Sequence, residues 1–216
     1  MEKIFFGVFK KNKFIYTNNL IPGKTVYGER IVKEEGIEYR SWDPFRSKLG
    51  GAIRKGLANW PFEKNSKILY LGASTGTTIS HLSDICTNGE IYSVEISAHV
   101  LERLVMLSEK RENIIPIMAD ARQPQEYLEV GEVDILYEDV AQPDQSDILL
   151  KNAGLFLKKG GIAFFAIKSQ SIDVLKNPQE IYDKIIKELQ DKFEILEKIK
   201  LEPYDKDHLF LVLKRK

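Results

Sequence analysis

The residues with the clearest chemical potential form a short glycine-rich segment, Gly72-Ala73-Ser74-Thr75-Gly76-Thr77-Thr78. It follows an apolar run that is typical of a buried strand, and it opens a helical pattern. Glycines let the backbone turn tightly and approach a ligand, and a helix N-terminus presents unpaired N–H groups. The segment predicts a nucleotide-like ligand bound by Gly72, Ala73, Gly76, Thr77 and Thr78, with an ordinary tight turn as the alternative. The Lys-Ser/Thr pair of a Walker A loop is missing.

Acidic and amide side chains follow three later apolar runs: Glu95-Ile96, Asp120-Ala121 and Asp139-Val140-Ala141-Gln142. The carboxyl ends of parallel strands meet at one edge of a sheet, and α/β proteins bind ligands there. Glu95 can accept both hydrogen bonds of a ribose diol, and Asp120 can accept one from an adenine amino group. These features are compatible with NAD or with S-adenosylmethionine. Asp139 and Gln142, after the fourth run, favour S-adenosylmethionine. An acid and an amide suit its compact amino-acid tail and positively charged sulfonium, whereas NAD needs a long crevice for a second nucleotide.

From residue 66 onward, short apolar runs alternate with helical patterns, which is typical of a mostly parallel α/β sheet. The predicted strands are Ser66–Gly72, Glu90–Ser97, Ile114–Met118, Val133–Glu138, Gly161–Lys168, Phe193–Leu201 and His208–Leu213. Only a short polar stretch separates the last two, so they must pair antiparallel. This layout is typical of the seven-stranded, Rossmann-like sheet of S-adenosylmethionine-dependent methyltransferases, with an antiparallel C-terminal hairpin.

Residues 1–54 show a different pattern from the rest of the chain. Short β-like runs at Ile4–Phe9, Lys13–Tyr16, Glu29–Val32 and Ile37–Tyr39 are joined by turn residues. They predict a small antiparallel β domain over residues 1–54, in front of a methyltransferase domain over residues 55–216.

Composition limits the classes of function. Lys plus Arg and Asp plus Glu both number 32, so the long-range field gives no overall attraction to nucleic acid or to an anionic membrane. A single cysteine, Cys86, excludes an internal disulfide framework, and no Cys/His spacing predicts a metal site. No apolar run approaches the roughly 20 residues of a membrane span. We therefore expect a cytoplasmic protein with no membrane partner.

Six stretches of the chain form a recognisable series, in this order: YRSWDPFRSKL from Tyr39, LYLGASTGTTISHLSDI from Leu69, NIIPIMADAR from Asn113, DVAQPDQSDIL from Asp139, AIKSQSID from Ala166 and EPYDKDH from Glu202. The series closely resembles the fibrillarin family in its archaeal form, the RNA-guided ribose 2′-O-methyltransferases of box C/D ribonucleoproteins. The resemblance implies methylation of rRNA, and of tRNA as a further target, with S-adenosylmethionine as the methyl donor.

The resemblance also implies a catalytic set, which falls here on Lys48, Asp139, Lys168 and His208. Lys168 is the candidate for orienting or deprotonating the ribose 2′-hydroxyl, and Asp139 for positioning this lysine and the sulfonium. The implied partners are a Nop-type scaffold protein, a kink-turn-binding ribosomal-like protein, a box C/D guide RNA and the target RNA.

Basic residues cluster locally in spite of the neutral total. Residues 40–55 hold only one acidic residue, and local arginines and lysines can neutralise phosphates. We expect RNA contacts from Arg40, Arg46, Arg54 and Lys55. The interleaved aromatic residues Tyr39, Trp42 and Phe45 are expected to pack in the core or between the domains. The zero net charge predicts weak RNA affinity for the isolated chain, so partners must capture the RNA.

Three other functions are compatible with parts of this sequence. They are a stand-alone RNA 2′-O-methyltransferase, a non-catalytic assembly subunit that only binds S-adenosylmethionine, and a nicotinamide-dependent dehydrogenase. Methyl transfer to a guide-matched RNA, with and without scaffold proteins, tests the first two, and competition by NAD but not by S-adenosylhomocysteine would indicate the third.

Overall fold

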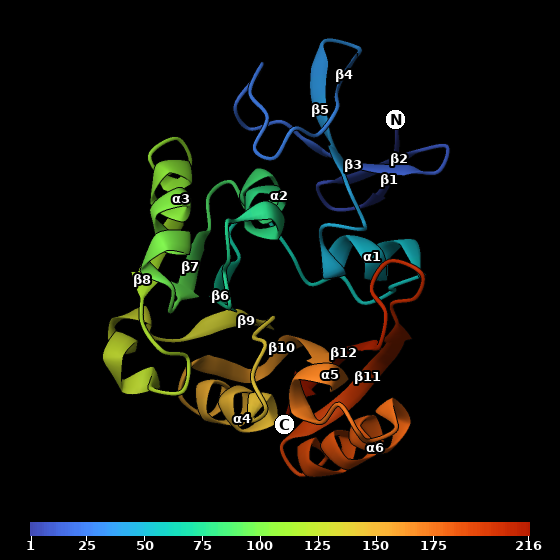
Figure 1. Ribbon diagram of the computed structural model, residues 1–216. Helices are drawn as coiled ribbons and strands as arrows, with labels where there is room; N and C mark the ends of the chain where they lie inside the picture. The colour runs from blue at the N-terminus through green and yellow to red at the C-terminus, as the bar shows by residue number, and fades with distance from the viewer.

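The computed structural model describes all 216 residues, and its larger sheet has seven strands in the order β11-β12-β10-β9-β6-β7-β8 (Figure 1). The strands are β6 (Lys67–Leu71), β7 (Glu90–Glu95), β8 (Ile114–Met118), β9 (Val133–Glu138), β10 (Leu157–Lys168), β11 (Phe193–Lys200) and β12 (His208–Arg215). All pairs are parallel except those that β12 makes with β10 and β11. The predicted methyltransferase-type sheet with its antiparallel C-terminal hairpin is confirmed.

Helices cover both faces of this sheet (Figure 1). They are α2 (Thr77–Ile85), α3 (Ala98–Ser108), α4 (Gln145–Phe156), α5 (Ser169–Ile172), α6 (Pro178–Leu189) and the 3-10 helix η1 (Pro124–Val130). On one face, Leu136 of β9 packs in a core with residues of α4 and α6. On the other face, Tyr137 packs in a core with residues of α2. Burial on both faces explains why the strands read as continuous apolar runs. None of the helices is both long and apolar enough to cross a membrane.

The N-terminal sheet has five antiparallel strands in the order β1-β2-β3-β5-β4. They are β1 (Glu2–Phe5), β2 (Val8–Lys11), β3 (Phe14–Asn18), β4 (Ile31–Glu34) and β5 (Ile37–Trp42). The prediction of one strand over Ile4–Phe9 is wrong, because that run contains the end of β1, the turn and the start of β2. Gly7 makes the turn with a φ of +72°, and a Cβ there would lie 2.9 Å from the side chain of Ile85.

Helix α1 (Lys48–Arg54) connects the two sheets in the chain, and Figure 1 shows it beside the loop of the C-terminal hairpin. Its N-terminus is capped by Ser47, whose hydroxyl accepts a hydrogen bond from the Gly50 N–H. The core around α1 includes Val8, Ile15 and Trp42 from the N-terminal sheet as well as residues of α2 and β6. The two sheets therefore share a core, and a domain boundary after residue 54 stays a prediction.

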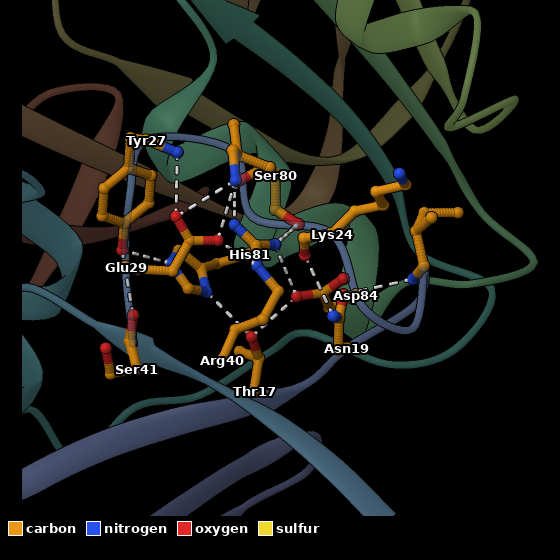
Figure 2. Close-up of polar contacts among 12 residues, drawn as sticks. Thr17, Asn19, Lys24, Tyr27, Glu29, Arg40, Ser41, Ser80, His81 and Asp84 are labelled. Atoms are coloured by element: carbon orange, nitrogen blue, oxygen red, sulfur yellow. Dashed lines mark hydrogen bonds and ion pairs between the residues drawn. The ribbon is translucent and has the colours of Figure 1, made fainter. Parts of the chain in front are cut away.

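A buried ionic network joins the N-terminal sheet to helix α2 (Figure 2). Arg40 of β5 donates from Nε to Glu29 Oε1 at 2.5 Å and from Nη1 to Asp84 Oδ2 at 2.8 Å. Its Nη2 donates to Ser80 Oγ at 3.0 Å, and Arg111 Nη1 donates to Asp84 Oδ1 at 2.7 Å. The predicted RNA contact of Arg40 is wrong, because its side chain is 0% exposed and these acceptors occupy its guanidinium.

His81 of α2 completes this junction. Its ring stacks on Trp42 at a centroid distance of 4.6 Å, and burial together with the charges of Arg40 and Arg111 holds its pKa well below the ordinary value. The Thr17 hydroxyl donates to Asp84, so the Nδ1–H of His81 must donate to Thr17 Oγ1, at 2.8 Å. Its Nε2 is then the acceptor that faces the Tyr27 hydroxyl at 2.7 Å. The neutral imidazole thus has a defined tautomer.

Removing Arg40 tests whether the network holds the two sheets together. Arg40→Met removes the cationic partner of the Glu29 carboxylate and one of the two that Asp84 has, because Arg111 remains beside Asp84. Breaking these buried pairs costs about 3 to 5 kcal/mol of unfolding free energy. Chemical denaturation measures this loss. The matched control is Arg30→Met, because Arg30 is exposed and lies just before β4; we expect a change below about 0.5 kcal/mol. Equal stability of the two variants would contradict this role of the network.

Candidate active site

A pocket lies at the carboxyl ends of the central parallel strands. Its lining is Gly72, Ser74, Val94, Glu95, Ile96, Ala119, Asp120, Ala121, Arg122, Asp139, Val140, Ala141, Gln142, Ile148 and Lys168. Ten of these residues belong to the predicted site. They meet because the ends of β6, β7, β8, β9 and β10 share one edge of the sheet.

The turn after β6 requires glycine at its first position. Gly72 has a φ of +78°, and a Cβ on it would lie 2.8 Å from the Asp139 carbonyl oxygen. Both constraints exclude a side chain without a shift of the backbone. The close approach brings the end of β6 against the end of β9, which shapes the pocket floor.

Glu95 is held in place at the pocket by its neighbours. Its Oε2 accepts from the Ser74 N–H and its Oε1 from the Ser97 N–H, each at 2.9 Å. Each carboxylate oxygen has a second acceptor site, so Glu95 can still accept two hydrogen bonds from a diol. This geometry fits the role that the sequence predicts for Glu95.

Arg122 is a pocket residue that sequence reasoning missed. Its Nη2 donates to Gln142 Oε1 at 2.6 Å, and its Nε donates to Asp144 Oδ2 at 2.8 Å. It therefore ties the loop after β8 to the loop after β9. The stretch NIIPIMADAR contains Arg122, but a lone arginine beside a strand end carries no signal of such a cross-link.

Four predicted cofactor residues, Ala73, Gly76, Thr77 and Thr78, do not line the pocket. Thr78 is 7% exposed and donates to Ser47 Oγ at 2.9 Å. A Cβ on Gly76 would lie 2.6 Å from Leu107 Cδ2, so this glycine packs against α3. Gly76 caps α2 and Thr77 and Thr78 form its first turn, whereas Ala73 is a buried residue between the two pocket residues Gly72 and Ser74.

Two lysines hold the side chain of Asp139. Lys168 Nζ lies 2.8 Å and Lys48 Nζ 3.0 Å from the same oxygen, Asp139 Oδ1. Lys168 Nζ also donates to the Asp139 carbonyl oxygen at 2.7 Å. Lys48 is the first residue of α1 and Lys168 the last of β10, so distant parts of the chain form this cluster. The side chains are only 14 to 18% exposed.

The pairing sets the charge state of the cluster. Burial alone would raise the pKa of Asp139, but Lys48 and Lys168 outweigh it and hold this pKa below its ordinary value. Burial alone would lower the pKa of Lys48, but Asp139 and Asp205 raise it above the ordinary value. At neutral pH, Asp139 is therefore a carboxylate and Lys48 an ammonium.

Gln145, at the start of α4, fixes the backbone of Lys168. It is fully buried, its Oε1 accepts from the Lys168 N–H at 3.0 Å, and its Nε2 donates to the Gln142 carbonyl at 2.9 Å. The end of β10 is thus attached to the loop after β9. Gln145 is a second positioning residue that the sequence did not single out.

His208 begins β12 and pairs with Lys168 in the strand register. Its Nδ1 lies 2.7 Å from the Lys206 carbonyl and 3.0 Å from Asp205 Oδ1, and Asp205 Oδ2 lies 3.5 Å from Lys48 Nζ. The four predicted catalytic residues therefore lie in one cluster, together with Asp205, which was not predicted.

The remaining predicted RNA contacts lie at the surface beside α1. Arg46 and Arg54 line a second groove with Phe45 and Tyr204, whereas Lys55 is exposed at the end of α1 outside it. Trp42 and Tyr39 are buried, as expected for packing residues, but Phe45 is 66% exposed. The expectation of core packing is wrong for Phe45, because the 43–47 turn carries it outward against Tyr204.

The fold and the pocket define the class of protein: a Rossmann-like α/β domain of the S-adenosylmethionine-dependent methyltransferase type, with an added N-terminal sheet. The chain belongs to the fibrillarin family, whose family model matches residues 1–216. A curated relative from Saccharolobus solfataricus, a fibrillarin-like rRNA/tRNA 2′-O-methyltransferase, is 51% identical over 220 residues, which cover 100% of this chain and 95% of the relative.

Solved fibrillarin structures agree with this assignment. The Methanococcus jannaschii fibrillarin pre-rRNA processing protein has a TM-score of 0.95 and 46% identity, covering 99% of this chain and 96% of that one. Aeropyrum pernix fibrillarin with natively bound S-adenosyl-L-methionine has a TM-score of 0.86 and 47% identity, covering 93% and 88%. A chain of a fibrillarin/Nop5p complex has a TM-score of 0.93 and 38% identity, covering 100% of both.

A side chain at position 72 tests the contact between the ends of β6 and β9. Gly72→Ala combines backbone strain with a collision at the Asp139 carbonyl, whereas Gly23→Ala has a similar φ of +76° and nothing within 4 Å. We expect Gly72→Ala to cost about 1 to 3 kcal/mol more unfolding free energy than Gly23→Ala. Equal losses in denaturation experiments would show that the close approach does not constrain the fold.

Proposed function

We propose that this chain transfers a methyl group from S-adenosylmethionine to a ribose 2′-hydroxyl of rRNA or tRNA, as the catalytic subunit of an RNA-guided box C/D ribonucleoprotein. The observation that carries the proposal is the continuity of the pocket with the lysine–carboxylate cluster, since Asp139 and Lys168 line the pocket themselves. Fibrillarin relatives with rRNA/tRNA 2′-O-methyltransferase activity support the choice of reaction.

The pocket fits S-adenosylmethionine by its donor and acceptor set. Glu95 offers two acceptor sites for the ribose diol, Asp120 offers carboxylate oxygens toward an adenine, and Asp139 offers negative charge beside the sulfonium. Gly72 keeps the pocket floor free of a side chain. When bound there, S-adenosylmethionine supplies an activated methyl group whose transfer leaves a neutral thioether.

The residues of this chain must align the acceptor oxygen and remove its proton. Lys168 directs the 2′-hydroxyl toward the pocket and, in its neutral amine form, accepts the hydroxyl proton as the new O–C bond forms. Asp139 fixes Lys168 Nζ through two contacts, at 2.8 and 2.7 Å, so the amine has a defined direction. Lys48 balances the charge of Asp139 and remains an ammonium.

RNA selection is assigned to partners of this chain. Its formal net charge is zero, so its own attraction to phosphate is weak. Arg46, Arg54 and Lys55 provide local contacts to RNA beside α1. A Nop-type scaffold protein docks the chain, as in the solved fibrillarin/Nop5p complex. A kink-turn-binding ribosomal-like protein and a guide RNA complete the assembly inside the cell.

Replacing Lys168 tests its assignment. Lys168→Met keeps the length of the side chain but removes the amine, so we expect methyl transfer in the full assembly to fall by about 10²- to 10⁴-fold. Binding of S-adenosylhomocysteine, measured by calorimetry, should stay near wild type. The control is Lys159→Met, an exposed lysine of the same strand, which should keep full activity. An active Lys168→Met variant would exclude this role.

Reconstitution separates the proposed function from its alternatives. Labelled methyl transfer to a guide-matched RNA should be about 10²-fold or more faster with the scaffold proteins and guide than with the chain alone, because assembly raises the effective concentration of the RNA. Equal rates would identify a stand-alone methyltransferase. Absence of methylation in the complete assembly would identify a non-catalytic subunit.

A further inference from the structure

We infer that Asp205 is a positioning residue that connects His208 to Lys48, so that His208 acts on the reaction through Asp205 and not on the substrate. The inference rests on the proposed methyl transfer and adds a residue to its machinery. It also gives His208 a role that differs from direct catalysis.

The contacts form a row of alternating partners. Asp139 Oδ1 lies 3.0 Å from Lys48 Nζ, Lys48 Nζ lies 3.5 Å from Asp205 Oδ2, and Asp205 Oδ1 lies 3.0 Å from His208 Nδ1. The two oxygens of Asp205 therefore face different partners. His208 does not line the pocket, and its Nδ1 faces Asp205 and the Lys206 carbonyl. This row gives His208 a connection to the cluster that does not pass through the pocket.

The hairpin loop that carries Asp205 is well anchored. The Tyr204 N–H donates to the Leu201 carbonyl at 2.8 Å, and the Asp207 N–H donates to Glu202 Oε1 at 3.3 Å. The Ser169 hydroxyl, just after Lys168, donates to the Asp207 carbonyl at 3.0 Å. These bonds hold the loop at both ends beside the end of β10. A fixed loop can direct a carboxylate at Lys48 without loss of orientation.

The position of Asp205 has a consequence for Lys168. Lys48 Nζ contacts both carboxylate oxygens of Asp139, Oδ1 at 3.0 Å and Oδ2 at 3.3 Å, and Lys168 Nζ lies 2.8 Å from Oδ1, so the two lysines meet at the Oδ1 atom. Asp205 gives Lys48 a second carboxylate, at 3.5 Å, and so helps to set the direction from which Lys48 contacts Asp139. Without Asp205, Lys48 depends on Asp139 alone and can change its contact with the carboxylate that also holds Lys168. His208 in turn keeps the Asp205 side chain in its bridging rotamer.

A double-mutant cycle measures this connection. The variants are Asp205→Asn, His208→Gln and their combination, assayed by single-turnover methylation in the complete assembly with saturating cofactor. We expect each single substitution to slow the reaction about tenfold, and the combination to be no slower than Asp205→Asn within about twofold. Asp205→Glu keeps the carboxylate and should lose less than about threefold. Asp207→Asn is the control, because this loop acid faces neither Lys48 nor His208, and it should stay near wild type.

Three results would overturn the inference. An equal tenfold effect of His208→Gln in the Asp205→Asn background would show that His208 acts independently of Asp205. Wild-type rates for Asp205→Asn would remove its role. Equal losses in Asp205→Glu and Asp205→Asn would reduce Asp205 to a structural loop residue.

A titration of lysine side chains by NMR tests the connection without any activity. Asp205 contributes to the raised pKa of Lys48, so this pKa should be lower in Asp205→Asn than in the wild-type chain and unchanged in Asp207→Asn. An unchanged pKa of Lys48 in both variants would contradict the contact. A wild-type assembly that fails to methylate RNA would contradict the proposed function instead, and the titration would still decide the role of Asp205.

Discussion

The candidate site depends on one mostly buried carboxylate that is shared by two lysine side chains. Asp139 stays charged because Lys48 and Lys168 outweigh the effect of burial. An unpaired charge at this depth would be expensive, so the carboxylate of Asp139 depends on its lysine partners. Lys168 is the last residue of β10, which belongs to the sheet that forms the pocket. Lys48 is the first residue of α1, outside that sheet, so its position beside Asp139 depends on how α1 packs.

The N-terminal sheet helps to position Lys48, although it does not contribute to the pocket. Strand β5 leads through a short turn into α1, so the position of β5 helps to set where Lys48 begins its helix. Arg40 fixes β5 to α2 through Asp84 and Ser80, and to the segment before β4 through Glu29, as Figure 2 shows. His81 and Trp42 add a stacked pair in the same place. The small sheet thus serves the site as a support for α1, and its buried charges have a structural function.

The residue pattern predicts most of the pocket, and the family resemblance predicts four residues of the cluster, but neither predicts the junction between the two sheets. Strand ends of a parallel sheet meet at one edge, so Glu95, Asp120 and Asp139 could be placed together before the fold was known. Arg40 was misassigned, because a local basic run does not reveal which side chains point inward to acids from other elements. Thr77 and Thr78 do not line the pocket, so their contact with the cofactor stays a prediction. The contact of Asp205 with the cluster was not predicted, because its partner Lys48 is far away in the sequence.

The central claim is that the charge of Asp139 organises both lysines for methyl transfer. Asp139→Asn keeps the shape of the side chain and removes the charge, so it isolates this claim. Single-turnover transfer of a labelled methyl group to guide-matched RNA, in the complete assembly with saturating S-adenosylmethionine, is the most direct measurement. The account predicts a loss of about 10²-fold or more in a folded protein. A rate within a few-fold of wild type would contradict it.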